Sequence, residues 1–349
     1  MRKFFVTGGA GFIGSAFVRL LLAEFPDCVV TNYDAMTYAG NPDNLDGLDP
    51  ERHRLVRGDI CDADSVLAAL EEGTDTLFNF AAESHVDRSI LSADEFLRTN
   101  VLGTQVLLDA ARERGVRRFV QISTDEVMGS LPEDDAAFFT EETPFAPNSP
   151  YAASKAAAEH LVRAAHHTHG LDVVTTRCGN NYGPRQFPEK LIPLLISNAL
   201  AGEAVPVYGD GQNVRDWIYV EDHCRAILLA AERGRPGGVY NVGARNPRHN
   251  LEVVESILDA LSRPRSLIRF VKDRPGHDRR YAINPALAER ELGWRPAETW
   301  ETGLRKTIEW YASNPGWLER ARSGAYRDFY RQQYGESLES GVASAESAG

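Results

Sequence analysis

Two short segments of the sequence carry side chains that could move protons in a reaction. Tyr151 and Lys155 form a YxxxK pair, and side chains four residues apart share one face of a helix. An ammonium group near a phenol favours the phenolate, so Tyr151 could accept a proton at neutral pH. The second segment is Thr124, Asp125 and Glu126. Its adjacent carboxyl groups could act as acid and base if burial or mutual repulsion keeps one of them protonated. A solvated acidic turn is the alternative.

A glycine-rich segment near the start of the chain predicts a dinucleotide-binding loop. Gly8, Gly11 and Gly14 form a GxxGxxG pattern between an apolar run, Phe4–Thr7, and a helix-like run, Ile13–Glu24. Glycine lets the backbone turn tightly and lets a pyrophosphate come close, and the helix N-terminus presents unpaired N–H groups to that anion. A glycine-rich turn with a purely structural role is the alternative.

Asp34 indicates which dinucleotide the loop would bind. It follows the second predicted strand, and a carboxylate there accepts hydrogen bonds from both ribose hydroxyls and repels a 2′-phosphate. No arginine is its neighbour in the sequence, so we expect NAD rather than NADP. The alternative is a surface aspartate in a turn. The ends of the third and fourth predicted strands are expected to contact the same cofactor through Asp59, Ile60, Phe80, Ala81 and Ala82.

The elements that must position these groups follow a regular rhythm up to residue 178. Short apolar runs alternate with longer amphipathic ones, which predicts a Rossmann-type α/β fold, a doubly wound parallel sheet with helices on both faces. Ligands bind at the carboxyl ends of such strands, which is where residues 124–126 fall. The predicted strands are 4–7, 28–32, 54–57, 76–80, 119–123 and 173–177, and the predicted helices are 13–24, 64–71, 99–114 and 153–169.

The rhythm breaks after residue 178, which predicts a smaller C-terminal substrate domain interleaved with the first. Pro- and Gly-rich stretches at 180–188 and 205–212 alternate with helix-like runs at 190–201, 219–232, 251–262 and 300–313, and 238–242 reads as one more sheet strand. We expect an NAD-binding domain of residues 1–178 plus 213–243 and a sugar-nucleotide-binding domain of residues 179–212 plus 244–330. The polar tail, 336–349, is expected to be disordered.

Composition excludes several classes of function. The 349-residue chain has a net charge of −12, which disfavours binding to nucleic acid or to an anionic membrane surface. The four cysteines are scattered, so neither a metal site nor a disulfide framework is expected. No signal peptide is recognised, and no apolar run approaches the roughly 20 residues that a membrane span needs. We expect a soluble cytoplasmic protein.

Several segments together resemble the dTDP-glucose 4,6-dehydratase family of the extended short-chain dehydrogenase/reductase superfamily. The glycine and YxxxK motifs are common to the superfamily, whereas the Thr-Asp-Glu and Arg-Pro-Gly-His segments are more specific. The chain departs from the usual pattern at Met128, where tyrosine is usual, and at Arg185, where an aromatic residue is usual. The segments are GGAGFIGS, YAGN, AAESHVDRSI, STDEV, SPYAASK, NNYGPRQFPEKLIP, GDGQNVRDWIYVEDH and DRPGHDRRYAI.

The resemblance implies a reaction and a role for each polar residue. Tyr151 would take the proton of the glucose 4-hydroxyl while the C4 hydride passes to NAD⁺. Glu126 would then remove the C5 proton, Asp125 would protonate the departing C6 hydroxyl, and the hydride would return to C6. Thr124 would bind the 4-hydroxyl, and Lys155 would hold the nicotinamide ribose. The product is dTDP-4-keto-6-deoxyglucose.

The resemblance also implies the remaining contacts with cofactor and substrate. Arg215 would bind the substrate, and its alternative role is a surface salt bridge with Asp216 or Glu221. Further cofactor contacts would come from Phe12, Ile13, Ala35, Met36, Thr37, Thr99 and Asn181. The substrate would be held by Ser84, Asn180, Lys190, Leu191, Pro206, Val207, Tyr208, Arg215, Asn250, Arg274 and His277.

The helices at 99–114 and 153–169 match the pair that forms a dimeric four-helix bundle in this family, so a homodimer is expected. Three other functions stay open from the sequence. They are a 4,6-dehydratase of a UDP-sugar, a sugar-nucleotide 4-epimerase and a non-catalytic NAD-sensing module. Epimerases usually lack the adjacent Asp-Glu pair.

Overall fold

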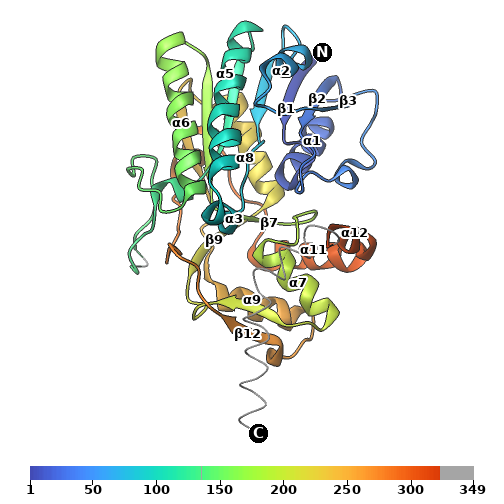
Figure 1. Ribbon diagram of the computed structural model, residues 1–349, viewed down its shortest axis with the longest axis vertical. Helices are drawn as coiled ribbons and strands as arrows, with labels where there is room; N and C mark the ends of the chain where they lie inside the picture. The colour runs from blue at the N-terminus through green and yellow to red at the C-terminus, as the bar shows by residue number, and fades with distance from the viewer. Residues whose placement is uncertain (135, 323–349) are drawn as a thin grey trace.

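A seven-stranded parallel sheet forms the centre of the computed structural model, which describes residues 1–134 and 136–322. Its strand order is β10-β6-β5-β4-β1-β2-β3, and helices cover both faces, so the predicted doubly wound Rossmann-type fold is confirmed (Figure 1). The strands are β1 Arg2–Thr7, β2 Cys28–Asp34, β3 His53–Arg57, β4 Thr76–Asn79, β5 Arg118–Thr124, β6 Val173–Cys178 and β10 Gly238–Val242.

Alternating side chains of β1 bury both faces of this sheet. Phe4 and Val6 pack under α1 and α8, whereas Phe5 packs on the opposite face against Leu107 of α5 and Val162 of α6. This two-sided burial explains why the central strands read as continuous apolar runs. The helices around the sheet are α1 Phe12–Glu24, α2 Ala63–Ala69, α3 Val86–Leu91, α4 Asp94–Phe96, α5 Thr104–Glu113, α6 Pro150–His169 and α8 Val220–Arg233.

The helix predicted at 99–114 is divided in the structure. Its first part belongs to a π-helix, Leu97–Gly103, and α5 follows directly. A π-helical turn is rare and is found mainly at functional sites. Here it places Thr99 on the cleft described below.

The C-terminal lobe contains two small sheets and its own core (Figure 1). A three-stranded sheet has the order β11-β9-β7, and a two-stranded parallel sheet pairs β12 with β8. The strands are β7 Asn180–Tyr182, β8 Val205–Tyr208, β9 Val214–Tyr219, β11 Pro247–His249 and β12 Ile268–Val271. The helices of this lobe are α7 Leu191–Ala201, α9 Asn250–Ala260, α11 Trp300–Ser313 and α12 Pro315–Ala321. Helix α10, Ala286–Leu292, packs instead on α8 and β10 of the Rossmann part. Single 3₁₀ turns lie at Pro42–Leu45, Asp125–Met128 and Arg265–Leu267.

The prediction of irregular chain at 205–212 is wrong for β8, and the helix predicted from Tyr219 omits the strand β9 before it. Tyr219 itself ends β9, and α8 begins at Val220. The predicted division into two domains stays a prediction, and the tail 336–349 lies outside the described residues. Within residues 1–134 and 136–322, no helix is both long enough and apolar enough to cross a membrane.

Candidate active site

A cleft of about 390 Å³ runs along the carboxyl ends of the central strands. The glycine loop and the end of β2 line one part of it, and the ends of β5 and β6 with the start of α6 line another. The cleft therefore lies at the strand ends, where parallel sheets bind their ligands. Of the predicted cofactor residues, it is lined by Gly8, Gly11, Phe12, Ile13, Gly14, Asp34, Ala35, Thr37, Asp59, Ile60, Phe80, Ala81, Ala82, Thr99, Tyr151, Lys155 and Asn181.

The glycine loop needs its glycines for close packing. Gly8 has φ +66°, and a Cβ atom there would lie 2.7 Å from the backbone nitrogen of Ala81. A Cβ atom on Gly14 would lie 2.2 Å from the carbonyl oxygen of Gly8. Helix α1 starts at Phe12, and no side chain caps its N-terminus. Its first N–H groups are thus available to an anion in the cleft.

Asp34 is buried at the end of β2, with both carboxylate oxygens engaged by the backbone. Oδ2 accepts a 2.9 Å hydrogen bond from the N–H of Ala10, and Oδ1 accepts a 2.8 Å bond from Met36. Burial raises the pKa of Asp34, although these two bonds lower it. No arginine forms a salt bridge with Asp34 in residues 1–134 and 136–322. Met36 holds this carboxylate through its backbone and does not itself line the cleft.

Asp125 and Glu126 begin a single 3₁₀ turn directly after β5. The Thr124 hydroxyl accepts a 3.3 Å hydrogen bond from the Glu126 N–H and lies 3.4 Å from Oδ1 of Asp125. The other oxygen of Asp125 is buried, and no residue of the described chain forms a hydrogen bond with it. The alternative of a solvated acidic turn is therefore wrong, because Asp125 is only 1% exposed.

The surroundings of the two carboxyl groups differ in charge. Burial raises the pKa of Asp125 well above its usual value, and the charges of Glu126 and Asp216 raise it further. Burial also raises the pKa of Glu126, but Arg274, Lys190 and Arg215 oppose that rise. Asp125 is thus the better proton donor, and Glu126 is the carboxyl that more readily ionises.

Tyr151 and Lys155 lie on the first turns of α6 and face the cleft. Burial lowers the pKa of Lys155 to about 8, while the charge of Glu159 opposes that shift. The ammonium group donates a 2.7 Å hydrogen bond to the carbonyl of Ile122. Burial, then the charge of Glu126, raises the pKa of Tyr151 well above its usual value. The protein groups by themselves thus favour the protonated phenol of Tyr151.

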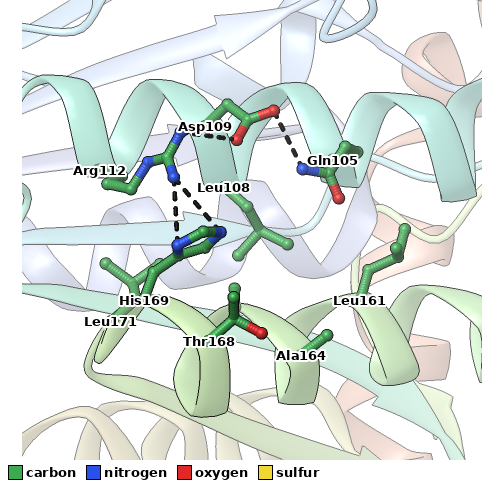
Figure 2. Close-up of a pocket in the computed structure, with 10 residues that line it drawn as sticks. Gln105, Leu108, Asp109, Arg112, Leu161, Ala164, Thr168, His169 and Leu171 are labelled. Atoms are coloured by element: carbon green, nitrogen blue, oxygen red, sulfur yellow. Dashed lines mark hydrogen bonds and ion pairs between the residues drawn. The ribbon is translucent and has the colours of Figure 1, made fainter.

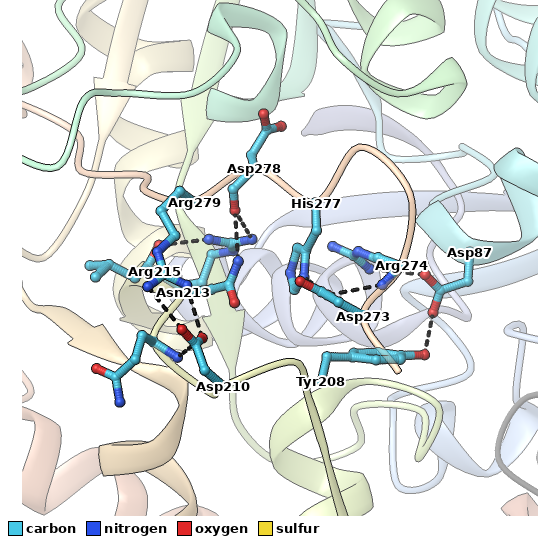
Figure 3. A network of polar contacts seen from close by, with 12 residues as sticks. Asp87, Tyr208, Asp210, Asn213, Arg215, Asp273, Arg274, His277, Asp278 and Arg279 are labelled. Atoms are coloured by element: carbon cyan, nitrogen blue, oxygen red, sulfur yellow. Dashed lines mark hydrogen bonds and ion pairs between the residues drawn. The ribbon is translucent and has the colours of Figure 1, made fainter. Parts of the chain in front are cut away.

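Next to the catalytic side of the cleft, polar residues of the C-terminal lobe form a connected network (Figure 3). Arg215 is buried, donates to the carbonyl of Asp278 at 2.8 Å and lies over the ring of Tyr281. The alternative of a surface salt bridge with Asp216 or Glu221 is therefore wrong. His277 lies 2.6 Å from Asp273, and burial, with Arg274 and Arg215, lowers its pKa to about 4. The imidazole of His277 is therefore neutral at neutral pH.

The remaining predicted substrate residues fall into two groups. Ser84, Asn180 and Lys190 line the cleft, and the Lys190 ammonium donates a 2.8 Å hydrogen bond to the carbonyl of Ser84. The other predicted substrate residues do not line it, and the side chain of Val207 is buried in the core of the C-terminal lobe. They are Leu191, Pro206, Val207, Tyr208, Asn250 and Arg274, together with Arg215 and His277 described above.

Known proteins resemble this chain over nearly its whole length. Residues 5–307 match the family model described as GDP-mannose 4,6 dehydratase. The chain is 49% identical to dTDP-glucose 4,6-dehydratase 1 of Escherichia coli K12, covering 95% of this chain and 99% of the relative. It is 52% identical to the dTDP-glucose 4,6-dehydratase of Xanthomonas campestris pv. campestris strain B100, covering 94% and 98%.

The chain belongs to the dTDP-glucose 4,6-dehydratase family. A solved structure agrees with this assignment. The dTDP-glucose 4,6-dehydratase of Streptomyces venezuelae, solved with NAD bound, superposes with a TM-score of 0.88 at 51% identity and covers 91% of this chain and 99% of that chain. The family resemblance stated from the sequence motifs is confirmed.

Two departures from the usual pattern of the family have structural settings away from the reacting groups. Met128 is buried, and its sulfur lies 3.8 Å from the guanidinium of Arg177. Arg185 has φ +68° and lies over the ring of Trp310 at 5.4 Å. Neither residue lines the cleft, so both leave its composition unchanged.

Sequence reasoning missed several polar residues of the cleft. Glu83, Gln186 and Glu189 line it, and burial raises the pKa of both glutamates. Glu83 and Glu189 directly precede Ser84 and Lys190, which the resemblance did identify. Their position next to predicted substrate residues could have indicated them. Gln186 lies within the segment NNYGPRQFPEKLIP, which marked the family but gave this residue no role.

Proposed function

We propose that this chain converts dTDP-glucose to dTDP-4-keto-6-deoxyglucose and water, with NAD as a bound cofactor. One observation carries the proposal: the adjacent carboxyl groups of Asp125 and Glu126 and the phenol of Tyr151 line one cleft together with a dinucleotide-binding loop. Oxidation of a sugar hydroxyl needs one proton acceptor, and elimination of water needs an acid and a base. Relatives at 49–52% identity carry the name of this activity.

The cleft fits NAD at both ends. The glycine loop leads into the uncapped N-terminus of α1, whose first N–H groups would receive a pyrophosphate, and Asp34 presents a carboxylate without an arginine partner in the described chain. Bound NAD⁺ would supply the hydride acceptor, and its positive charge would favour the ionised phenol. Lys155 would hold the nicotinamide ribose, and Ala81 and Ala82 leave space at the end of β4.

The protein groups divide the proton transfers among them. Tyr151 accepts the proton of the 4-hydroxyl, which the Thr124 hydroxyl orients. Glu126 removes the C5 proton, which the 4-keto group makes acidic, and the neighbouring cations Arg274, Lys190 and Arg215 support its ionised form. Asp125, whose pKa burial raises most clearly, gives its proton to the departing C6 hydroxyl.

The nucleotide end of the substrate is assigned to the C-terminal lobe. Arg and Lys side chains suit a diphosphate because the guanidinium fork forms bidentate bonds. We assign this contact to Lys190, Arg215 and Arg274, with His277, Asn180 and Asn250 beside them, and the base to Leu191 and the segment 206–208. Ser84 would hold the sugar. The predicted boundaries between an NAD-binding and a sugar-nucleotide-binding domain accord with this assignment and are part of the proposal, as is a cytoplasmic location.

We further propose a homodimer through α5 and α6. These helices lie side by side and form a shallow cavity lined by Leu108, Leu161, Ala164 and Thr168 (Figure 2). Leu102 of the adjoining π-helix and Leu91 of α3 are 49% and 65% exposed. A second copy would cover this cavity, whose lining also includes Gln105, Asp109, Arg112 and His169, and complete a four-helix bundle.

Product analysis tests the activity. The protein is incubated with dTDP-glucose, UDP-glucose and UDP-N-acetylglucosamine in turn, and products are identified by mass. We expect dTDP-glucose to lose one water. A product of unchanged mass would instead indicate an epimerase, and turnover of a UDP-sugar alone would indicate a different dehydratase. Deuterium placed at C4 of dTDP-glucose should be recovered at C6, and its absence from C6 would refute the hydride cycle.

A further inference from the structure

Asp87 is a buried carboxylate that joins the Rossmann part of the chain to the C-terminal lobe. It belongs to the short helix α3 and is only 7% exposed. Its Oδ2 accepts a 3.2 Å hydrogen bond from the hydroxyl of Tyr208, and its Oδ1 accepts a 3.1 Å hydrogen bond from Nη1 of Arg274 (Figure 3). Both carboxylate oxygens therefore bind residues of the other lobe.

The two partners of Asp87 leave the same end of one small sheet. Tyr208 is the last residue of β8 and pairs with Val271, the last residue of β12. Arg274 follows β12 by three residues. One carboxylate thus fixes the strand end and the loop that carry the assigned nucleotide contacts Tyr208, Arg274 and His277.

Arg274 keeps donors that Asp87 does not use. Its Nε is buried and has no hydrogen-bond partner in the described chain, and Asp87 takes only Nη1. Burial works against the charge of Arg274, but Asp87 and Glu126 together raise its pKa above the usual value. Among the neighbouring cations, Arg274 acts most strongly on Glu126. The guanidinium is therefore held by Asp87 within electrostatic reach of Glu126, with donors left for a diphosphate.

We propose that Asp87 is a positioning residue of the nucleotide clamp, holding Arg274 in the orientation that receives the diphosphate of the substrate and Tyr208 in the orientation that borders the base. The inference rests on the proposed function, because it takes a nucleoside diphosphate as the ligand of Arg274. An arginine has four rotatable side-chain bonds, so fixing it before binding removes an entropic cost that the ligand would otherwise meet. Asp87 acts through Arg274 and has no role in the reacting bonds.

Binding of dTDP to the full chain with its cofactor, measured by calorimetry, tests this role. We expect Asp87→Ala to weaken dTDP binding about tenfold and to raise KM for dTDP-glucose by a similar factor, as for loss of one hydrogen bond to a charged group. The change in kcat should be smaller. Asp87→Asn, which keeps one neutral acceptor oxygen, should give an intermediate effect, and Tyr208→Phe tests the second contact without removing the first.

A double-mutant cycle distinguishes a role of Asp87 in orienting the nucleotide contacts from a role that only stabilises the contact between the two lobes. If Asp87 works through Arg274 and Tyr208, adding Asp87→Ala to the double variant Arg274→Ala/Tyr208→Phe weakens dTDP binding no further. The matched control is Asp172→Asn, which breaks a 2.9 Å pair with Arg118 at the opposite ends of the sheet strands and should lower Tm without changing dTDP affinity. Additive losses in the cycle, or an Asp87 variant that changes Tm alone, would overturn the proposal. Failure of the unmodified protein to dehydrate dTDP-glucose would refute the proposed function, while the dTDP titrations would still test Asp87.

Discussion

At the scale of single residues, two adjacent carboxyl groups differ because their neighbours differ. Burial and neighbouring negative charges raise the pKa of Asp125, whereas three neighbouring cations oppose the rise in the pKa of Glu126. The sequence places both at a strand end and indicates that one would be protonated. Only the family resemblance indicates which one, because Arg215 and Arg274 reach the pair from distant segments of the chain.

Replacing both groups by amides should separate oxidation from elimination. In Asp125→Asn/Glu126→Gln, Tyr151 and Lys155 remain, so reduction of the nicotinamide by dTDP-glucose should stay detectable in the absorbance spectrum. Formation of the 4-keto-6-deoxy product should fall by about 10²-fold or more, as for loss of general acid–base catalysis. Glu133→Gln, at an exposed ion pair with Arg279, serves as the control. A double variant that binds NAD yet shows no reduction would contradict the assigned roles.

Lys155 should make the stability of the protein depend on pH. Its pKa is lowered by burial from 10.5 to about 8, so the unfolded chain binds more protons than the folded one between these values. The folded state therefore carries the full free-energy cost of burying the Lys155 ammonium below pH 8. This cost falls to zero as the pH rises towards 10.5. Lys155→Met should therefore be more stable than the unmodified protein at pH 7, by up to about 3 kcal/mol, and the difference should shrink at higher pH. Urea unfolding at several pH values measures this, and a constant difference would contradict the shift.

At the scale of elements, the sequence predicts those whose contacts are local or periodic. The strands of the central sheet were found because parallel strands buried on both faces read as apolar runs. β8 was missed because Pro206 interrupts a four-residue run, and proline is tolerated there on a strand with a single partner. β9 was missed because Arg215 and Asp216 break its apolar pattern. Both are buried and bound by segments beyond residue 240: Arg215 donates to the carbonyl of Asp278, and Asp216 accepts from the N–H of Asn246.

A buried ion pair fastens α6 to β6 just behind the catalytic residues. Arg177 donates to Glu159 at 2.8 Å, and both side chains are almost fully buried. Glu159→Gln should lower the free energy of unfolding by about 3 kcal/mol or more, because it leaves the guanidinium buried without its counter-charge. The double variant Glu159→Gln/Arg177→Met should recover much of that loss. Urea unfolding measures both, with Glu24→Gln at an exposed pair with Arg225 as the control. Equal losses in Glu159→Gln and Glu24→Gln would contradict this account.

At the scale of the whole molecule, the proposed reaction site draws on residues of both lobes. The sheet supplies the cofactor loop, the carboxyl pair and Tyr151, while the C-terminal lobe supplies the cations that act on Glu126. Strand-end rules could therefore locate the first set from the sequence. The second set depends on contacts between segments more than 60 residues apart, such as Arg215 with Asp278, and only the motif resemblance pointed to it.

The exposed face of α5 and α6 allows the proposed homodimer to be tested. Ala164 is exposed beside the cavity in Figure 2, and a charged side chain there would be buried in a four-helix bundle without a partner. Ala164→Glu should convert a dimer into a monomer in sedimentation experiments. Leu55→Glu, at an exposed position of β3 on the far edge of the sheet, should leave the dimer intact. Because residues of one chain line the cleft, the monomer should still bind NAD. Its free energy of unfolding should be lower than that of the dimer. An unmodified protein that sediments as a monomer would refute the interface, and a Leu55→Glu variant that also dissociates would place it elsewhere.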